Sequence, residues 1–261
     1  MNSAMKQKLS PSFPIVSFTH MSVKYRDQLA LQDINGHINS GSLTAILGPN
    51  GGGKSTLLKT LSGFLKPFRG SVKYQGINAR QIAYLPQQAD IDRSFPLTVR
   101  EVVAMGLTQE RGFLGDLEGI YEKNIREALA QVELTQHFNR SLHTLSGGQF
   151  QRALFARLSI QKSDLILLDE PFSAIDHATI EDLMKLVINW HQKGKTILIV
   201  THDLELIRRY FPETLLLAKK VIAWGSTSEV LTLDNLRKAK KLSCDWENRL
   251  ELEPDEFLTT L

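Results

Sequence analysis

The stretch Gly48-Pro49-Asn50-Gly51-Gly52-Gly53-Lys54-Ser55-Thr56 follows an apolar run from Leu43 to Leu47 and predicts the centre of the fold. It has the form Gly-x-x-x-x-Gly-Lys-Ser/Thr, in which glycines let backbone N–H groups turn inward around phosphate oxygens. A helix that begins near Gly53 would add its positive end to the same site. We therefore expect Lys54 to reach the β- and γ-phosphates of a nucleoside triphosphate and Ser55 to reach Mg²⁺. A glycine-rich turn that only joins a strand to a helix has the same composition, and the rest of the chain distinguishes the two.

The composition describes a globular chain with one sizeable core. With 261 residues, 42% of them hydrophobic, the chain can form one domain, or one domain with a smaller inserted subdomain. A net charge of +3 gives no support to nucleic-acid binding. The single cysteine, Cys244, excludes an intramolecular disulfide. No apolar stretch approaches about 18 residues and the first residues lack an apolar signal core, so we expect neither a membrane span nor export.

Polarity patterns predict two kinds of sheet. The segments Ile15–Tyr25 and Leu29–Ile38 partly alternate in polarity, which indicates antiparallel strands with a turn at Arg26-Asp27-Gln28. The runs Leu165–Leu168 and Thr196–Val200 are instead continuously apolar or β-rich, and a helical stretch from 175 to 192 separates them. That order implies a parallel sheet with helices on its faces. The predicted fold class is α/β: a phosphate-loop core with a parallel sheet, an N-terminal antiparallel β subdomain and an inserted helical subdomain.

The helical insertion is expected between residues 98 and 162, where no good strand signal occurs. Two segments of the form Ser/Thr-x-x-Glu/Gln predict helix starts there, Thr98-Val99-Arg100-Glu101 and Ser146-Gly147-Gly148-Gln149. We expect one domain over residues 1–261, with its core in 15–97 and 163–235 and a C-terminal tail from 236. The basic run Arg237-Lys238-Ala239-Lys240-Lys241 favours a solvated helix face over a phosphate-binding patch.

A second candidate site lies at the end of the run Leu165-Ile166-Leu167-Leu168-Asp169-Glu170-Pro171. Two acids that end a hydrophobic strand should lie at the carboxyl edge of the sheet, where open α/β folds bind ligands. Asp169 is placed to hold Mg²⁺, directly or through water. Its neighbour Glu170 points to the other side, toward the γ-phosphate, where it could polarise an attacking water. A solvated pair of acids at a strand end is the alternative.

The segment Leu145-Ser146-Gly147-Gly148-Gln149 resembles the signature of the ABC ATPase family. A serine and two glycines at a helix start expose N–H groups and a positive dipole end, which suit a γ-phosphate. An ordinary capped helix would have the same features. The segment occurs between the phosphate loop and the strand that ends in Asp169, and this order strengthens the resemblance. The resemblance covers about residues 15 to 233.

The resemblance assigns further residues to the nucleotide site. Tyr25 lies where the family places an aromatic ring that stacks on adenine, although it could also be a strand-surface tyrosine. Gln87 matches a glutamine that meets Mg²⁺ and the attacking water, with Gln88 leaving the register open by one residue. Ser173-Ala174-Ile175-Asp176 is similar to a loop that reaches across a dimer, with Ile175 in place of the usual leucine. His202 matches a histidine that contacts the γ-phosphate, and its alternative role is to cap the following helix.

The other histidines lack metal-ligand spacing, and we interpret them as surface residues or hydrogen-bonded core residues. They are His20, His37, His137, His143, His177 and His191. The cofactors that the resemblance implies are therefore ATP and Mg²⁺, with no transition metal bound by this chain.

The resemblance also implies a homodimer. In that family the nucleotide lies between the phosphate loop of one copy and the signature helix of another, so two copies sandwich two ATP molecules head to tail. Binding of ATP would then close the dimer, and hydrolysis would open it.

The partners follow from the same resemblance. A single nucleotide domain is similar to the separate ATPase subunit of a bacterial importer, which needs an integral membrane permease and, indirectly, a periplasmic or surface solute-binding protein. We expect it in the cytoplasm, peripheral on the inner face of the plasma membrane. The segment from Asp90 to Gly106 resembles the corresponding region of manganese- and zinc-importer ATPases, where a coupling helix of the permease docks. Phe95 and Leu97 could at the same time simply pack the start of a capped helix.

Three alternatives stay open. The chain could serve an importer of an iron chelate, haem or cobalamin. It could be a soluble ABC ATPase of iron–sulfur cluster assembly, or a nucleotide-switched module in DNA or ribosome work. The absence of a long coiled coil between the motifs argues against DNA repair, and the presence of only one nucleotide domain argues against a ribosome factor.

Overall fold

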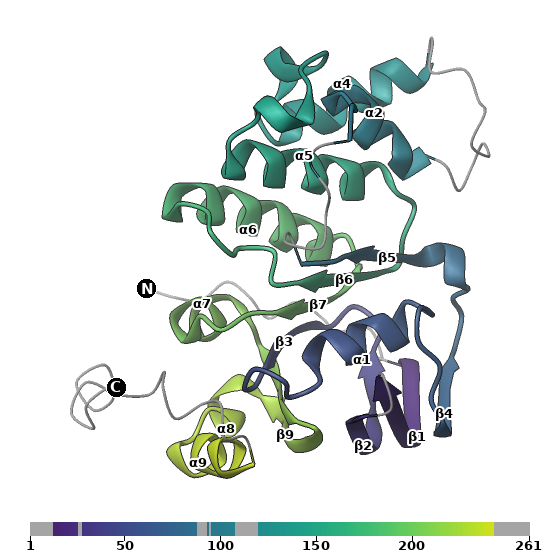
Figure 1. The fold of residues 1–261 in the computed structure, drawn as a ribbon, viewed down its shortest axis with the longest axis vertical. Coiled ribbons are helices and arrows are strands. Elements are labelled where there is room, and N and C mark those ends of the chain that lie inside the picture. The colour runs from purple at the N-terminus through teal and green to yellow at the C-terminus, as the bar shows by residue number, and fades with distance from the viewer. Residues whose placement is uncertain (1–12, 26–27, 88–92, 94, 108–119, 243–261) are drawn as a thin grey trace.

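Two sheets and a stack of helices form the molecule (Figure 1). The computed structural model describes residues 13–25, 28–87, 93, 95–107 and 120–242. In these residues no helix is long and apolar enough to cross a membrane.

The smaller sheet is antiparallel and has the strand order β2-β1-β4. Its strands are β1 (Pro14–Tyr25), β2 (Gln28–Asn39) and β4 (Arg69–Tyr74). The predicted antiparallel pair is confirmed, with Val16 opposite Ile38 and Val23 opposite Leu31. Residues 26 and 27 of the expected turn lie outside the described residues. The sequence did not predict β4, which is largely exposed and carries little apolar alternation.

The larger sheet has six strands in the order β5-β6-β7-β3-β8-β9. Every residue of the three central strands β3, β6 and β7 is buried, as their continuous apolar runs predict. Neighbours from β5 to β8 pair in parallel, whereas β9 pairs antiparallel with β8 at the edge, so the sheet is mixed and mainly parallel. The strands are β3 (Leu43–Leu47), β5 (Ile82–Leu85), β6 (Leu165–Asp169), β7 (Thr196–Val200), β8 (Glu213–Ala218) and β9 (Lys220–Ser226).

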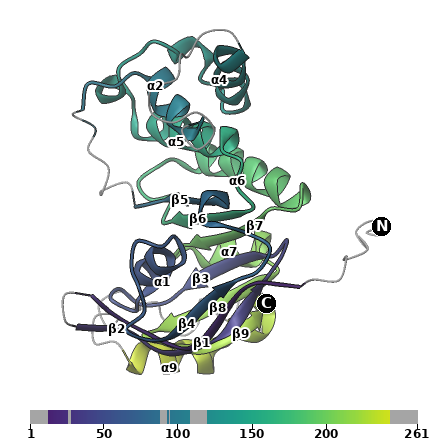
Figure 2. The same ribbon diagram turned by 90° about the vertical axis from the view of Figure 1, so that its right-hand side faces the viewer.

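Alternate residues of the central strands feed two separate apolar cores. Leu165 and Leu167 of β6 join the cluster that contains α1 (Lys54–Leu61) and the antiparallel strands. Ile166 and Leu168 face the opposite side, toward α5 (Gly147–Ile160) and α6 (His177–Gln192). Figure 2 shows α1 between the two sheets, and α6 between the larger sheet and α5. The sheet is thus covered on both faces.

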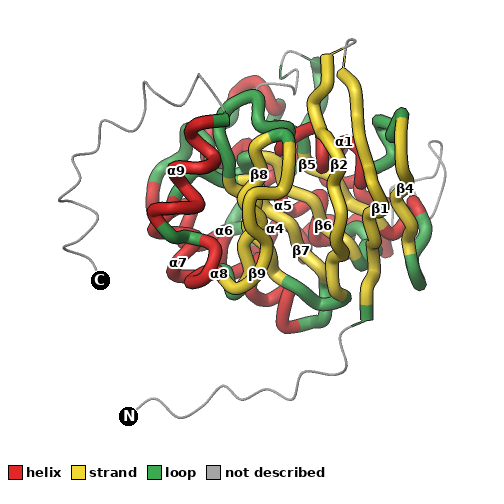
Figure 3. Tube along the Cα trace, turned by 90° about the horizontal axis from the view of Figure 1, so that it is seen from below, coloured by secondary structure: helices red, strands yellow, loops and turns green. Residues whose placement is uncertain are grey.

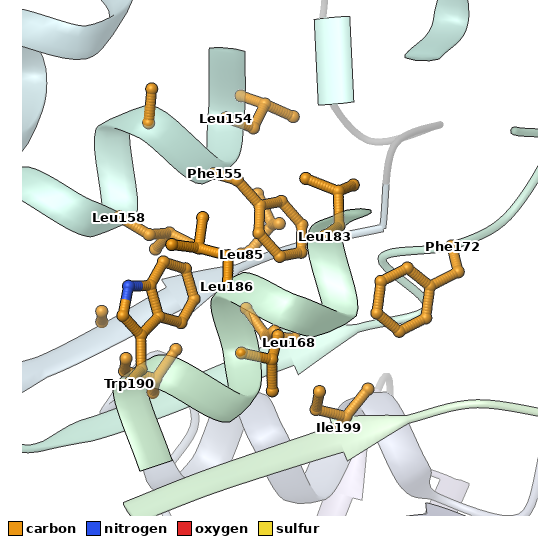
Figure 4. Close-up of a cluster of buried hydrophobic side chains, with 14 of the residues drawn as sticks. Leu85, Leu154, Phe155, Leu158, Leu168, Phe172, Leu183, Leu186, Trp190 and Ile199 are labelled. Atoms are coloured by element: carbon orange, nitrogen blue, oxygen red, sulfur yellow. The ribbon is translucent and has the colours of Figure 1, made fainter. Parts of the chain in front are cut away.

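The second core joins the helical part of the molecule to the sheet. Phe155 of α5 stacks on Trp190 of α6, with ring centroids 5.7 Å apart. Leu168 and Ile199 of the sheet lie beneath these rings in the same cluster (Figure 4). Burial of such rings is worth several kcal/mol in total, on the order of 1.5–3 kcal/mol for each large side chain. The signature helix α5 is therefore anchored on the sheet both through α6 and by direct contact with β5.

The helical part contains both predicted capping boxes. Thr98 caps α2 (Val99–Ala104) with Glu101 as its partner, and Ser146 caps α5 with Gln149. In the described residues between 98 and 162 there is no strand, only an isolated bridge between Thr98 and Ser141. The remaining elements here are η3 (Met105–Leu107), α4 (Ile120–Gln131), η4 (Thr135–His137) and η5 (Leu142–Thr144).

The C-terminal helices lie beside β8 and β9, on the side away from β4 (Figure 3). They are α7 (Leu204–Tyr210), α8 (Thr227–Val230) and α9 (Leu233–Lys241), and a short η1 (Ala79–Gln81) precedes β5. The basic run lies on α9, where Ala239 is buried and Arg237, Lys238 and Lys241 are exposed, so the solvated helix face is confirmed.

Candidate functional site

The phosphate loop connects β3 to α1, and two of its glycines are required by close contacts. A Cβ atom on Gly48 would lie 1.9 Å from the carbonyl oxygen of Leu217 in β8. Gly53 is the N-cap of α1 with φ at +92°, and a Cβ atom there would lie 2.6 Å from the carbonyl oxygen of Ala30 in β2. The loop is thus packed between β8 and β2, and its glycines serve that packing as well as N–H exposure.

A cavity of about 860 Å³ opens over this loop. Its lining brings together residues that the sequence placed in one site from five separate segments: Tyr25, residues 49–56, Gln87, Glu170 and His202. Gly48 and Asp169 lie behind this lining. The signature residues 146–149 and Asp176 do not line the cavity of their own chain.

Lys54 is held inside the loop. Its Nζ atom donates hydrogen bonds to the carbonyl oxygens of Gly48 and Pro49, each at 2.9 Å, and the side chain is buried. The ammonium is thereby fixed against the backbone of the phosphate loop. Such an arrangement adds a full positive charge to the partial charges of the loop, which suits a polyphosphate.

Asp169 is a buried carboxylate beside the phosphate loop. It is 1% exposed, and its Oδ1 atom has no hydrogen-bond partner among the described residues. Burial raises the pKa of Asp169, while a hydrogen bond from Ser55 acts against that rise. An unsatisfied buried carboxylate oxygen next to a serine hydroxyl is a donor set that fits Mg²⁺. The residues present therefore fit the metal that the sequence predicts.

Glu170 lies next in sequence but points into the cavity. Its Oε1 atom is 2.7 Å from Nε2 of His202, and its Oε2 atom accepts a hydrogen bond from Nε2 of Gln87 at 2.9 Å. The contact with His202 lowers the pKa of Glu170, so this carboxyl is ionised at neutral pH. Its backbone has φ at +48°, in the left-handed region that a non-glycine residue rarely adopts. This conformation separates its side chain from that of Asp169 and places it among the cavity residues.

His202 does not cap the following helix. Asp203 is the N-cap of α7, and its Oδ1 atom accepts a hydrogen bond from the backbone N–H of Leu206 at 2.9 Å. The alternative role for His202 is therefore wrong, because the neighbouring aspartate already satisfies the helix end. The imidazole is left to contact Glu170.

The signature segment forms a compact helix start. The backbone N–H of Gln149 donates to the Ser146 hydroxyl at 3.2 Å, and the Gln149 side chain accepts from the Ser146 N–H at 3.1 Å. A Cβ atom on Gly148 would lie 3.2 Å from Oγ1 of Thr179, so this glycine packs against the start of α6. Asp176 caps α6 through the N–H of Thr179 at 2.9 Å, and that hydrogen bond lowers the pKa of Asp176.

Sequence reasoning missed several residues that line the cavity, three of which follow α7. Ala218, Lys219 and Leu242 line the cavity, and no motif marks them. Lys219 has φ at +59° in the tight connection between β8 and β9. Its N–H donates to the carbonyl oxygen of Gly52, and its own carbonyl accepts from the N–H of Gln32, both at 2.7 Å. This connection therefore braces the phosphate loop against β2.

The fold and this site together define a phosphate-loop nucleotide-binding protein of the α/β class, with a helical part between the loop and the acidic strand end. A sequence model of the ABC transporter family matches residues 31–173. The chain belongs to this family. It is the ATP-binding subunit of an ABC transporter, an ABC ATPase.

Curated relatives cover most of the chain. The probable metal transport system ATP-binding protein of Chlamydia pneumoniae is 40% identical over 84% of this chain and 86% of its own length. The manganese transport system ATP-binding protein MntB of Bacillus subtilis is 37% identical over 87% and 92%. The zinc transport system ATP-binding protein TroB of Treponema pallidum is 36% identical over 89% of both chains.

Solved structures share the fold. A metal-chelate type ABC transporter in an inward-facing conformation superposes with a TM-score of 0.78 at 30% identity, over 88% of this chain and 90% of the other. A dimeric ATP-binding cassette in a post-hydrolysis state, bound to ADP and Pi, superposes with a TM-score of 0.72 at 29% identity, over 81% and 98%.

Proposed function

We propose that this chain is the ATP-hydrolysing subunit of an ABC importer that takes up a divalent metal ion, manganese or zinc. One observation carries the assignment of hydrolysis: Glu170 lies between Gln87 and His202 in the cavity above the phosphate loop. Two relatives that align over most of their length are named as ATP-binding proteins of a manganese and a zinc transport system, and these names support the proposed cargo.

The nucleotide would occupy the cavity with its adenine at Tyr25 and its phosphates in the loop. Tyr25 lines the cavity and is 43% exposed, and an aromatic ring at the cavity wall suits stacking on adenine. Residues 48–56 would surround the phosphates with N–H groups, and Lys54 would meet the β- and γ-phosphates. Ser55, Gln87 and Asp169 are the groups that would hold Mg²⁺. When bound, the ion neutralises charge on the β- and γ-phosphate oxygens.

Glu170 is the candidate general base. A water near its carboxylate would donate a proton toward it and be oriented for attack on the γ-phosphorus. The lowered pKa of Glu170 keeps the carboxylate available, and Gln87 fixes its second oxygen. His202 would contact the γ-phosphate itself while it aligns Glu170. Lys54 would hold the charge that develops during transfer.

The complete site would contain a second copy of the chain. The N–H groups of Gly147 and Gly148 and the hydroxyl of Ser146 lie outside their own chain's cavity, although they form a positive helix end. A head-to-tail homodimer would place them, with Gln149 and Asp176, against the nucleotide of the partner. The dimeric form of the similar cassette bound to ADP and Pi supports this arrangement.

The membrane partner would dock near the segment that follows β5. Phe95 is 60% exposed, whereas Leu97 packs against the helical core, so the simple packing role holds for Leu97 only. Phe64 is 73% exposed, and its ring lies 5.8 Å from that of Tyr84 in the edge strand β5. Exposed aromatic side chains beside an edge strand suit contact with a permease helix. The remainder of the segment from Asp90 to Gly106 includes residues outside the described ones.

The subunit would thus work on the cytoplasmic face of the plasma membrane, with an external solute-binding protein delivering the metal to the permease. A metal chelate is a second candidate cargo, which the similarity to a metal-chelate type transporter favours. Uptake of radioactive manganese, zinc and an iron chelate in cells with and without the gene separates the two. Loss of chelate uptake alone would overturn the divalent-metal assignment.

The Glu170→Gln variant tests hydrolysis directly. It keeps the shape of the side chain but cannot take a proton, so ATP turnover should fall at least about a hundredfold, as loss of a general base predicts. The variant should also accumulate as an ATP-bound dimer, measured by analytical ultracentrifugation. Undiminished turnover would remove Glu170 from its assigned role.

A further inference from the structure

The structure assigns a positioning role to Arg93, which joins the segment after Gln87 to the signature segment of the same chain. Its Nη2 atom donates hydrogen bonds to the carbonyl oxygens of Leu145 at 2.8 Å and Ser146 at 3.4 Å. The carbon of its guanidinium lies 4.4 Å from the centre of the Phe150 ring, in the first turn of α5. We propose that Arg93 fixes the signature segment in the geometry that receives the partner's nucleotide.

The contacts are of a kind that only arginine makes well. A guanidinium is planar, so it can stack on an aromatic face and direct N–H groups at carbonyl oxygens beyond the ring edge. Phe150 is fully buried, which gives the stack a rigid base. The Nε atom of Arg93 is buried too and has no hydrogen-bond partner in the described part of the chain, so Nη2 alone ties the group to the signature backbone.

The contacted carbonyls are those that set the direction of the signature N–H groups. Ser146 is the N-cap of α5, and its carbonyl also accepts the first helical hydrogen bond, from Phe150. The peptide planes around residues 145 and 146 decide where the exposed N–H groups of the helix start point. Hydrogen bonds to these two carbonyls therefore restrict the part of the signature that can move without breaking α5.

The position of Arg93 in the chain gives this contact a function beyond stability. Arg93 follows Gln87 by six residues, and six residues extend to at most about 20 Å. Gln87 contacts Glu170 in one nucleotide site, while Arg93 contacts the signature that would complete the other site. A short stretch of chain thus links a residue of each site in one molecule.

The inference rests on the proposed dimer, and the test uses the Glu170→Gln chain as its parent. Arg93→Gln in this parent should weaken ATP-driven dimerisation at least about tenfold, the effect of losing a hydrogen bond from a charged donor. Affinity of the monomer for a fluorescent ATP analogue should not change, because Arg93 does not line the cavity. Arg93→Lys keeps the charge but loses the planar group and should restore little of the dimerisation.

Arg126→Gln is the matched control. Arg126 also stacks on an aromatic ring in the helical part, with its guanidinium carbon 4.0 Å from the centre of Phe138, but its hydrogen bond goes to Glu122. This variant should dimerise like the parent. Equal dimerisation of the Arg93→Gln and parent chains would overturn the proposal. A loss of ATP affinity in the Arg93→Gln monomer as large as its loss of dimerisation would also overturn it.

Hydrogen–deuterium exchange separates this inference from the proposed function. In the monomer, peptides that cover residues 144–150 should exchange faster in Arg93→Gln than in either the wild-type chain or Arg126→Gln. If the parent fails to dimerise, the proposed dimer is wrong, while the exchange rates still decide the contact. Unchanged exchange over residues 144–150 would show that Arg93 does not hold the signature segment.

Discussion

Glu170 and Asp169 are adjacent carboxylates whose surroundings shift their pKa values in opposite directions. Hydrogen bonding to His202 lowers the pKa of Glu170, and burial raises that of Asp169. The left-handed backbone at Glu170 separates the two side chains. One carboxylate is thereby kept ionised in the cavity, and the other is buried with an unsatisfied oxygen beside Ser55. This difference in environment supports a base role for one and a metal role for the other.

We predict that His202→Gln raises the pKa of Glu170 toward the ordinary glutamate value, because it removes the contact that lowers it. Carbon-13 NMR titration of the glutamate carboxyls measures this pKa. In the wild-type chain the lowered pKa contributes stability that is present above the unfolded-state pKa of Glu170 and is lost as pH falls through the folded-state value. His20→Gln, at an exposed histidine paired with Asp33, is the control and should leave Glu170 unchanged.

A second prediction concerns Asp169→Asn. Because burial disfavours the Asp169 carboxylate, the neutral amide should raise the melting temperature of the nucleotide-free chain at neutral pH. The same change removes a proposed metal ligand. The factor by which Mg²⁺ increases the affinity for ATP should therefore fall at least about tenfold. Differential scanning fluorimetry and ATP titrations with and without Mg²⁺ check the two effects. A stabilised variant that still responds fully to Mg²⁺ would refute the metal role.

At the scale of elements, the phosphate loop depends on strands that the motif does not include. Gly48 abuts β8, Gly53 abuts β2, and the backbone of Lys219 ties Gly52 to Gln32. The loop is thus held from both sides by the connection between β8 and β9 and by the antiparallel sheet. Its shape is a property of this packing and not only of its glycine content.

We therefore predict that Gly48→Ala destabilises the fold by about 3 kcal/mol or more, since a methyl group would overlap a backbone carbonyl that cannot rotate away. Gly76→Ala is the control. Gly76 has φ at +73°, but a Cβ atom there would meet no atom within 4 Å, so the change should cost only about 1 kcal/mol of backbone strain. Chemical denaturation measures both. Similar losses for the two variants would show that the contact with β8 is unimportant.

At the scale of the whole molecule, the cavity over the phosphate loop and the signature segment lie apart. The cavity holds the phosphate loop, Glu170 and His202, while the signature helix is carried by α6 and the stacked rings of Phe155 and Trp190. Within its described residues, a single chain therefore keeps the phosphate loop and the signature in separate places. A head-to-tail dimer would unite them.

Mixing two inactive chains tests this arrangement. Lys54→Ala lacks a working phosphate loop and Ser146→Arg lacks a working signature, so each alone should hydrolyse little ATP. In a mixed dimer one site would combine the intact loop of one chain with the intact signature of the other. An equal mixture should recover up to about a quarter of the wild-type rate, since half of the dimers are mixed and each has one intact site. No recovery on mixing would contradict the composite site.

The sequence predicted elements best where one local rule governs the residues. The continuous apolar or β-rich runs predicted the bounds of β3 and β7, and both capping boxes form as predicted. The strands β4, β5, β8 and β9 were not predicted. In β4 and β9 the residues are partly exposed, and β9 gains its place by pairing at a sheet edge, which no local pattern records.

The sequence by itself determined the phosphate loop, the acidic strand end and the family, because those motifs depend on side-chain type and spacing along a continuous stretch. Only the tertiary structure decided that Asp203 rather than His202 caps α7, that Lys219 braces the loop and that Arg93 contacts the signature. The contacts of Lys219 and Arg93 join residues far apart in the chain, whereas the choice between His202 and Asp203 as cap depends on where α7 begins. Their geometry follows from how sheets and helices pack, and spacing in the sequence carries no record of it.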